Sequence, residues 1–170
     1  MNIFEEGTFF NPTRGQLSLS QTLEEMLSYM QERSEYAYEI VVGCDSPAVL
    51  EPFFPVVIVV LRKGGGGRFF LKRIFYPNNR KFHSLHQRIL EEVLLSCQLA
   101  IFLRGELEKQ VGLRDSSLNF SFRYIHADVG EIGPTKDMVK EVTGLIRGNG
   151  FEPCIKPNSF AASTVADRFS

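Results

Sequence analysis

The chain has 170 residues, of which 44% are hydrophobic and 23% are charged, with a formal net charge of −1. These values are typical of a soluble globular protein, and the length fits one domain that spans residues 1–170. The sequence has no apolar run near the roughly 20 residues of a membrane helix, and its first ten residues lack the bases of a secretory signal.

Residues 1–36 are predicted to form an N-terminal extension made of a loop and then a helix over 18–33. Apolar residues recur at helical spacing from Leu23 to Met30. Ser18 and Gln21 match the capping-box motif that starts a helix. This segment is expected to pack against the rest of the domain and to carry no chemistry.

Three strands are predicted next, over 39–45, 55–61 and 68–76. The first ends on a carboxylate, Asp45, which must be solvated, paired or bound to a metal because burying a lone carboxylate is costly. A simple turn is the other interpretation of Asp45. The four glycines at 64–67 favour a hairpin turn over a phosphate-binding loop, because no Lys-Ser/Thr follows and no helix begins there.

A long helix is predicted over 81–110, with a centre that is apolar nearly all round and so is buried against the sheet. Glu91 and Glu92 interrupt that centre, and neighbours on a helix point about 100° apart, so only one can face the end of the sheet. A strand over 118–127 then delivers a second acid, Asp128.

The chain closes with a helix over 135–147, a strand over 151–156 and a small-residue helix over 160–169 that carries Asp167. Three meandering strands followed by strands that alternate with helices predict one mixed sheet with helices on its faces.

Charge is distributed unevenly: residues 1–61 hold nine acids and two bases, whereas residues 62–88 hold eight bases and no acid. With its interleaved aromatic residues, this basic segment suits contact with a phosphate backbone. A charged, solvated strand edge explains it equally well. The residues predicted to contact nucleic acid are Arg68, Lys72, Arg73, Arg80, Lys81, His86, Arg88 and Lys156.

The three cysteines, Cys44, Cys97 and Cys154, are widely separated and lie in apolar contexts. They predict buried free thiols in a reducing compartment, with no structural zinc. We therefore expect a cytoplasmic protein.

The order of these elements resembles the ribonuclease H-like fold, an α/β fold with a mixed five-stranded sheet (three antiparallel strands, then two parallel ones) flanked by helices. In that fold the first strand, the following helix, the fourth strand and the last helix carry acids, which here correspond to Asp45, Glu92 or Glu91, Asp128 and Asp167. Converging carboxylates can hold two divalent ions about 4 Å apart, which activate water and stabilise the leaving oxygen of a phosphodiester. Mg²⁺ or Mn²⁺ suits such oxygen ligands.

Five segments carry a closer resemblance to the YkuK-like family of ribonuclease H-like proteins. They are FFNPTRG at 9–15, VVGCDS at 41–46, HQRILEE at 86–92, HADVGEIGPTK at 126–136 and GNGFEPCIKPNSFAASTVAD at 148–167. The resemblance favours Glu92 over Glu91, and it draws attention to His126, Lys156 and Ser163 without giving them roles.

The leading hypothesis is a Mg²⁺- or Mn²⁺-dependent nuclease that hydrolyses phosphodiester bonds in RNA or an RNA-containing duplex. Its metal ligands and catalytic residues would be Asp45, which bridges the ions, with Glu92, Asp128 and Asp167. One alternative is a non-catalytic module on the same fold that binds nucleic acid or a protein partner. In another, the acids are structural and residues 62–88 form an oligomer interface.

Overall fold

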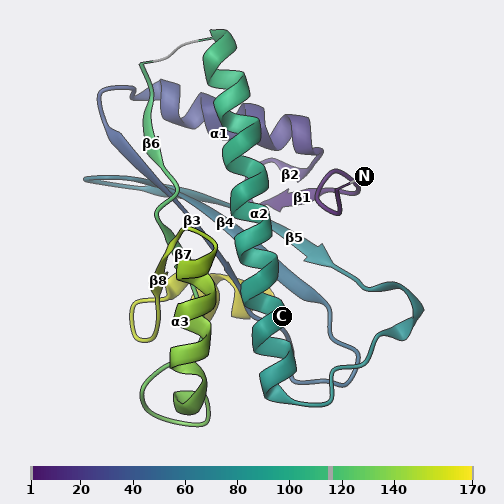
Figure 1. Cartoon of the computed structure of the whole chain (residues 1–170). Helices are drawn as coiled ribbons and strands as arrows, with labels where there is room; N and C mark the ends of the chain where they lie inside the picture. Colours follow the sequence, from purple (N-terminus) through teal and green to yellow (C-terminus); the bar gives the residue numbers. More distant parts are fainter. Residues whose placement is uncertain (1, 115–116, 170) are drawn as a thin grey trace.

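A mixed sheet forms the centre of the protein, for which a computed structural model describes residues 2–114 and 117–169 (Figure 1). Its strands are β1 (Phe9–Asn11), β2 (Gly15–Leu17), β3 (Ala37–Cys44), β4 (Phe54–Arg62), β5 (Gly67–Ile74), β6 (Asn119–Ser121), β7 (Tyr124–His126) and β8 (Glu152–Cys154). They lie in the order β2-β1-β5-β4-β3-β7-β8, with β6 also paired to β3. The α/β class and the mixed sheet are confirmed, but in the described residues the sheet has eight strands rather than the five predicted.

Helices cover both faces of this sheet. They are α1 (Leu19–Glu32), η1 (Pro77–Asn79), α2 (Leu85–Arg114), η2 (Lys136–Met138), α3 (Val139–Gly148), η3 (Ala161–Ala166) and η4 (Asp167–Phe169). The long helix α2 crosses one face beside α1 and α3 (Figure 1), whereas η3 packs on β3 and β4. None of the helices in the described ranges is long and apolar enough to pass through a membrane.

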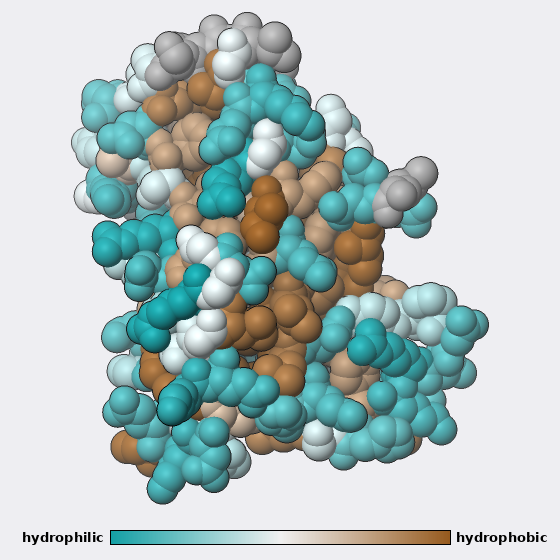
Figure 2. Space-filling view, viewed as in Figure 1, coloured by the Kyte–Doolittle hydropathy of each residue, from teal (hydrophilic) through white to brown (hydrophobic). Residues whose placement is uncertain are grey.

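The two faces of the central strands belong to two separate apolar clusters. Ile40 and Val42 of β3 contribute to the large cluster, while Val41 between them packs with the C-terminal segment. This alternation follows from the two-residue period of a strand, and burial on both faces explains the nearly continuous apolar sequence of β3. On the outside, apolar side chains also gather over the middle of α2 (Figure 2).

The antiparallel meander β3-β4-β5 forms as predicted, with Ile58 paired to Val42 on one side and Phe70 on the other. The glycines make the turn between β4 and β5: the Arg62 backbone N–H donates to the Gly66 carbonyl at 3.0 Å. Gly66 has a φ of +88°, a conformation that glycine adopts without strain. The hairpin interpretation of residues 64–67 is therefore confirmed.

The N-terminal extension forms α1, and the predicted capping box is present at its start. The Ser18 N–H donates to Gln21 Oε1 at 2.8 Å, and the Gln21 N–H donates to Ser18 Oγ at 3.2 Å. The loop predicted before this helix instead contains β1 and β2, which extend the sheet beyond β5 through the pair Phe10 and Leu71. Strands of three residues are too short to show an alternating pattern in the sequence.

The second half of the chain departs from the prediction at two places. The strand expected over 118–127 is divided into β6 and β7, and between them the Arg123 carbonyl accepts a hydrogen bond from the N–H of Glu152, the first residue of β8. The helix expected over 160–169 is a π-helical turn, η3, followed by the 3₁₀ turn η4. Both β7 and β8 run parallel to β3, as predicted for the last two strands.

Candidate functional site

The four predicted acids come together at one end of the sheet. Asp45 directly follows β3 and Asp128 lies two residues after β7, and these strands are parallel neighbours whose carboxyl ends share an edge. Glu92 reaches this edge from α2, and Asp167 begins η4. All three of these other carboxyls act electrostatically on Asp45. The structure therefore assembles one acidic site, which we call the four-acid site, from four elements that are distant in the sequence.

Asp45 is the central member of the four-acid site. Burial raises the pKa of Asp45 to about 8, with further increases from the charges of Glu92 and Asp128 and from a side-chain hydrogen bond with Asp167. Like charges crowded in a partly desolvated place favour protonation of one of them. A divalent cation among these groups would remove the same repulsion.

Glu92 is 3% exposed, and one of its oxygens is held by the loop that follows β3. Its Oε1 accepts hydrogen bonds from the Ser46 N–H at 2.8 Å and the Ser46 hydroxyl at 2.6 Å. Arg88, one turn earlier on α2, donates to the carbonyls of Ser46 and Pro47, each at 3.3 Å. Burial raises the pKa of Glu92 to about 7 although the Ser46 bonds and the Arg88 charge lower it. These contacts fasten the loop that carries Asp45 to α2.

Glu91 points elsewhere, as expected for neighbours on a helix. It accepts a hydrogen bond from the Tyr76 hydroxyl, and its Oε2 lies 3.5 Å from the Arg80 guanidinium. The structure thus brings Glu92, and not Glu91, into contact with the loop after β3.

Replacing Ser46 with alanine removes the hydroxyl donor that holds Glu92 Oε1. Because this hydrogen bond favours the ionised carboxylate, we expect the pKa of Glu92 in Ser46→Ala to rise further above about 7. A carbon-detected NMR titration of the glutamate carboxyls measures it. Ser96→Ala is the matched control, since the Ser96 hydroxyl donates to the Glu92 backbone carbonyl instead. Equal pKa values in both variants would show that the Ser46 hydroxyl does not control Glu92.

Asp128 carries an oxygen that is buried without a hydrogen bond. Its Oδ1 has almost no exposed surface and accepts no hydrogen bond from any residue that the structure describes. The Lys156 ammonium lies 3.1 Å away, close enough for an ion pair but outside hydrogen-bonding geometry. Asp128 Oδ1 therefore retains the capacity to bind a further positive ligand.

The C-terminal segment that carries Asp167 is seated directly on the backbone of β3. A Cβ atom at Gly43 would lie 2.7 Å from the Ala162 nitrogen and 3.0 Å from the Ala161 carbonyl carbon, so this position has room only for glycine. His126 fixes the same segment, because its Nδ1 accepts a hydrogen bond from the Ala161 N–H at 3.2 Å. Burial lowers the pKa of His126 to about 4, which keeps the ring neutral and able to accept. His126 thus positions η3 and so Asp167.

Two residues that matter here were given no role by the sequence. Gly43 lies two residues before Asp45 and Ser46 directly after it, but nothing in this spacing shows which part of the chain lies opposite. Ser163, to which the resemblance drew attention, donates its hydroxyl to the Ser159 carbonyl, four residues earlier, at 2.7 Å.

The four-acid site offers only carboxylate oxygens, which are the ligands that Mg²⁺ and Mn²⁺ prefer. The unused acceptor Asp128 Oδ1 also fits a cation. In residues 2–114 and 117–169, however, no three Asp, Glu, His or Cys side chains are already arranged around a metal-binding point. Glu92 is held by Ser46, and Asp128 is held by Lys156. The donor chemistry fits a hard divalent ion, and an ion that binds Asp128 Oδ1 would meet the Lys156 ammonium beside it.

The predicted nucleic-acid-binding residues do not form one surface. Side chains on β5 alternate between faces, so Arg68 and Lys72 lie on the side of α1 while Arg73 donates to the Phe169 carbonyl at 3.4 Å on the other. Arg68 lies 3.5 Å from Glu25. Lys72 is 5% exposed, and its ammonium donates to the Glu6 backbone carbonyl.

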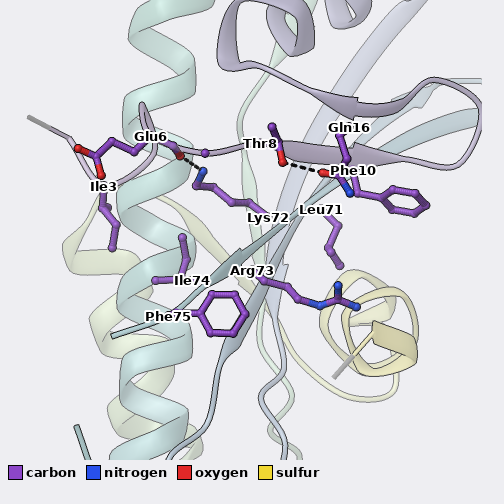
Figure 3. Close-up of a pocket in the computed structure, with 11 residues that line it drawn as sticks. Ile3, Glu6, Thr8, Phe10, Gln16, Leu71, Lys72, Arg73, Ile74 and Phe75 are labelled. Atoms are coloured by element: carbon purple, nitrogen blue, oxygen red, sulfur yellow. Dashed lines mark hydrogen bonds between the residues drawn. The ribbon is translucent and has the colours of Figure 1, made fainter. Parts of the chain in front are cut away.

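Lys72 and Arg73 both line a hollow of about 530 Å³ at the edge of the sheet, between β5 and the N-terminal segment (Figure 3). Lys72 turns toward the Glu6 carbonyl, whereas Arg73 points away from it toward the C-terminal segment. None of the four acids lines this hollow. It is therefore separate from the four-acid site.

The remaining predicted bases lie at the start of α2, in the loop before it, or after β8. Arg88 contacts the loop after β3, and Lys156 contacts Asp128. Lys81 is exposed in the loop before α2, and His86 in the first turn lies 2.8 Å from Glu141 of α3. Arg80 is paired with Glu91, as described above.

Comparisons with known proteins bear on the fold. A family model described as Ribonuclease H-like matches residues 21–170. The chain is 29% identical over 170 residues to Uncharacterized protein YkuK of Bacillus subtilis (strain 168), with 95% of this chain and 96% of that protein covered. No solved structure matches the chain significantly. By its sequence match and its mixed sheet flanked by helices, this chain belongs to the ribonuclease H-like family.

Proposed function

We propose that this protein is a nuclease that hydrolyses phosphodiester bonds in RNA or in an RNA-containing duplex, with Mg²⁺ or Mn²⁺ bound at the four-acid site. The observation that carries the proposal is the convergence of four acids from separate elements at one end of the sheet, where burial and the charges of Glu92, Asp128 and Asp167 raise the pKa of Asp45. Acids that strongly perturb one another in this way are typical of functional sites. When bound, divalent ions would activate water and stabilise the leaving oxygen.

Hydrogen bonds within the chain hold two of the proposed ligands in place. Ser46 orients Glu92 through two hydrogen bonds, and Arg88 anchors the loop that carries Asp45. Asp45 would be the bridging ligand, because it is the acid on which all three other carboxyls act. The carboxylates are carried by the ends of strands and by helices that pack on them, which is a rigid setting for ligands.

Nucleic acid would approach the four-acid site from the start of α2 and the loop after β8. Arg88 and Lys156 stand beside the acids, while Lys81 precedes α2 and His86 lies in its first turn. Their charges would contact phosphates, and binding would then weaken with rising salt.

A second candidate function is a module that binds nucleic acid without cleaving it. One observation favours it: among the described residues, the acids are not already gathered around a point for a metal ion. Such a module would show salt-dependent binding and no turnover at any metal concentration.

A cleavage assay separates the two functions. End-labelled RNA, an RNA–DNA hybrid and duplex DNA are incubated with the protein in EDTA, Mg²⁺ or Mn²⁺. We expect cleavage of the RNA-containing substrates with either ion, its loss in EDTA, and its recovery when excess Mg²⁺ is added. Salt-sensitive binding without cleavage under every condition would replace the nuclease with the binding module.

A further inference from the structure

Contacts of its backbone and its side-chain stem position Lys156 beside the four-acid site. Its backbone N–H donates to the Val129 carbonyl at 2.8 Å. Its stem lies on Gly130, where a Cβ atom would be 3.1 Å from Lys156 Cβ and 3.5 Å from its Cδ. This packing directs the ammonium to within 3.1 Å of Asp128 Oδ1. The backbone and the stem are thus fixed, and the head group rests on one of the proposed metal ligands.

The head group is held less firmly than the stem. The Lys156 side chain is 44% exposed, and its ion pair with Asp128 lacks hydrogen-bonding geometry. Arg88 differs, because its guanidinium is held by two backbone carbonyls. A lysine ammonium is a compact charge on a flexible four-carbon stem and can change partners at little cost.

The Lys156 ammonium and a divalent ion would bind the same carboxylate, that of Asp128. The charge of Asp128 acts on both Asp45 and Glu92, so a positive charge at Asp128 relieves repulsion across the whole site. The ammonium provides part of this relief already. An ion that takes Asp128 Oδ1 as a ligand must displace the ammonium, because two cations at one buried oxygen repel each other.

We propose that Lys156 is an internal competitor of the divalent ion for Asp128, and that the displaced ammonium then contacts a phosphate of the substrate. This inference rests on the proposed function, because it needs ion binding at the four-acid site. The residue would set how much Mg²⁺ the site requires and would link ion binding to substrate binding.

Calorimetric titration of the full chain with Mg²⁺ tests the competition without any measurement of activity. We expect Lys156→Met to bind Mg²⁺ about two- to fivefold more tightly, which is the worth of a partly exposed ion pair. The matched control is Lys109→Met. The native Lys109 ammonium also lies 3.1 Å from a carboxylate oxygen, that of Glu106, but Lys109 is 17 residues beyond Glu92 on α2. Lys109→Met should leave Mg²⁺ affinity unchanged. Lys156→Arg, which keeps the charge, should retain weak Mg²⁺ binding like the native chain.

In a cleavage assay, the two constants of Lys156→Met should move in opposite directions. The Mg²⁺ concentration for half-maximal rate should fall, while the KM for the RNA-containing substrate should rise because a phosphate contact is lost. General damage to the fold would not produce this pair of changes. Native protein that binds Mg²⁺ with the same affinity as Lys156→Met would overturn this inference alone. Two folded proteins that bind no Mg²⁺ would overturn the metal site as well.

Discussion

Asp45→Asn is expected to reduce metal-dependent cleavage by about a hundredfold or more, since a bridging ligand lowers the activation barrier by about 3 kcal/mol or more. The fold should survive, because asparagine has nearly the same shape and carries no charge into a place already crowded with Glu92, Asp128 and Asp167. Cleavage of an RNA–DNA hybrid in Mg²⁺, followed against native protein of equal helix content by circular dichroism, measures the loss.

The same variant should change how stability depends on pH. The pKa of Asp45 is about 8 in the folded protein against an ordinary value of 3.8, so between these pH values the folded state holds a proton that the unfolded state has lost. The free energy of unfolding therefore falls as pH rises from about 4 to about 8. In Asp45→Asn this fall should be smaller, and the variant should melt at a higher temperature near pH 8.

Urea unfolding of both proteins at several pH values measures this slope. Asp137→Asn, which replaces an exposed acid on η2, is the control and should keep the native slope. A cleavage rate in Asp45→Asn equal to that of the native protein would remove the proposed mechanism. If the pH dependence of the free energy of unfolding were unchanged in Asp45→Asn, the pKa of Asp45 would not be raised in the folded protein.

Gly43→Ala is expected to destabilise the protein by about 1–3 kcal/mol and to lower cleavage sharply. The added methyl group would meet the backbone of Ala161 and Ala162, which cannot turn aside as a flexible side chain can. The C-terminal segment must then lift from β3 and carry Asp167 away from Asp45. Thermal unfolding and the cleavage assay measure the two effects.

Gly105→Ala is the control for this substitution. Gly105 lies within α2, and a Cβ atom there meets nothing within 4 Å in the described part of the chain. Alanine should stabilise this helix by about 0.5–1 kcal/mol and leave cleavage unchanged. If Gly43→Ala behaved like Gly105→Ala, the close seating of the C-terminal segment on β3 would be refuted.

Local patterns made much of this architecture predictable. The apolar run that stops at Asp45 has the composition of a strand buried on both faces, and β3 is such a strand. The Ser18 and Gln21 motif forms the capping box, and the glycines at 64–67 form the hairpin turn. In each case the signal lies within a few neighbouring residues, which is the range over which sequence determines backbone conformation directly.

Features that depend on distant partners could not be predicted in the same way. Ser46 and Glu92 are 46 positions apart, and only the packing of α2 on the end of β3 joins them. The basic segment looked like one surface, but β5 divides its side chains between two faces, and the N-terminal segment covers Lys72. Neither fact is visible until the strands are paired, because register and coverage are properties of the assembled sheet.

Calorimetry of Mg²⁺ or Mn²⁺ binding, with native protein compared with Asp45→Asn, tests whether the four acids hold the ion. We expect micromolar-to-millimolar binding to the native protein that is lost in the variant, with both proteins folded. Equal binding to the two proteins would place the ion away from Asp45 and contradict the four-acid site.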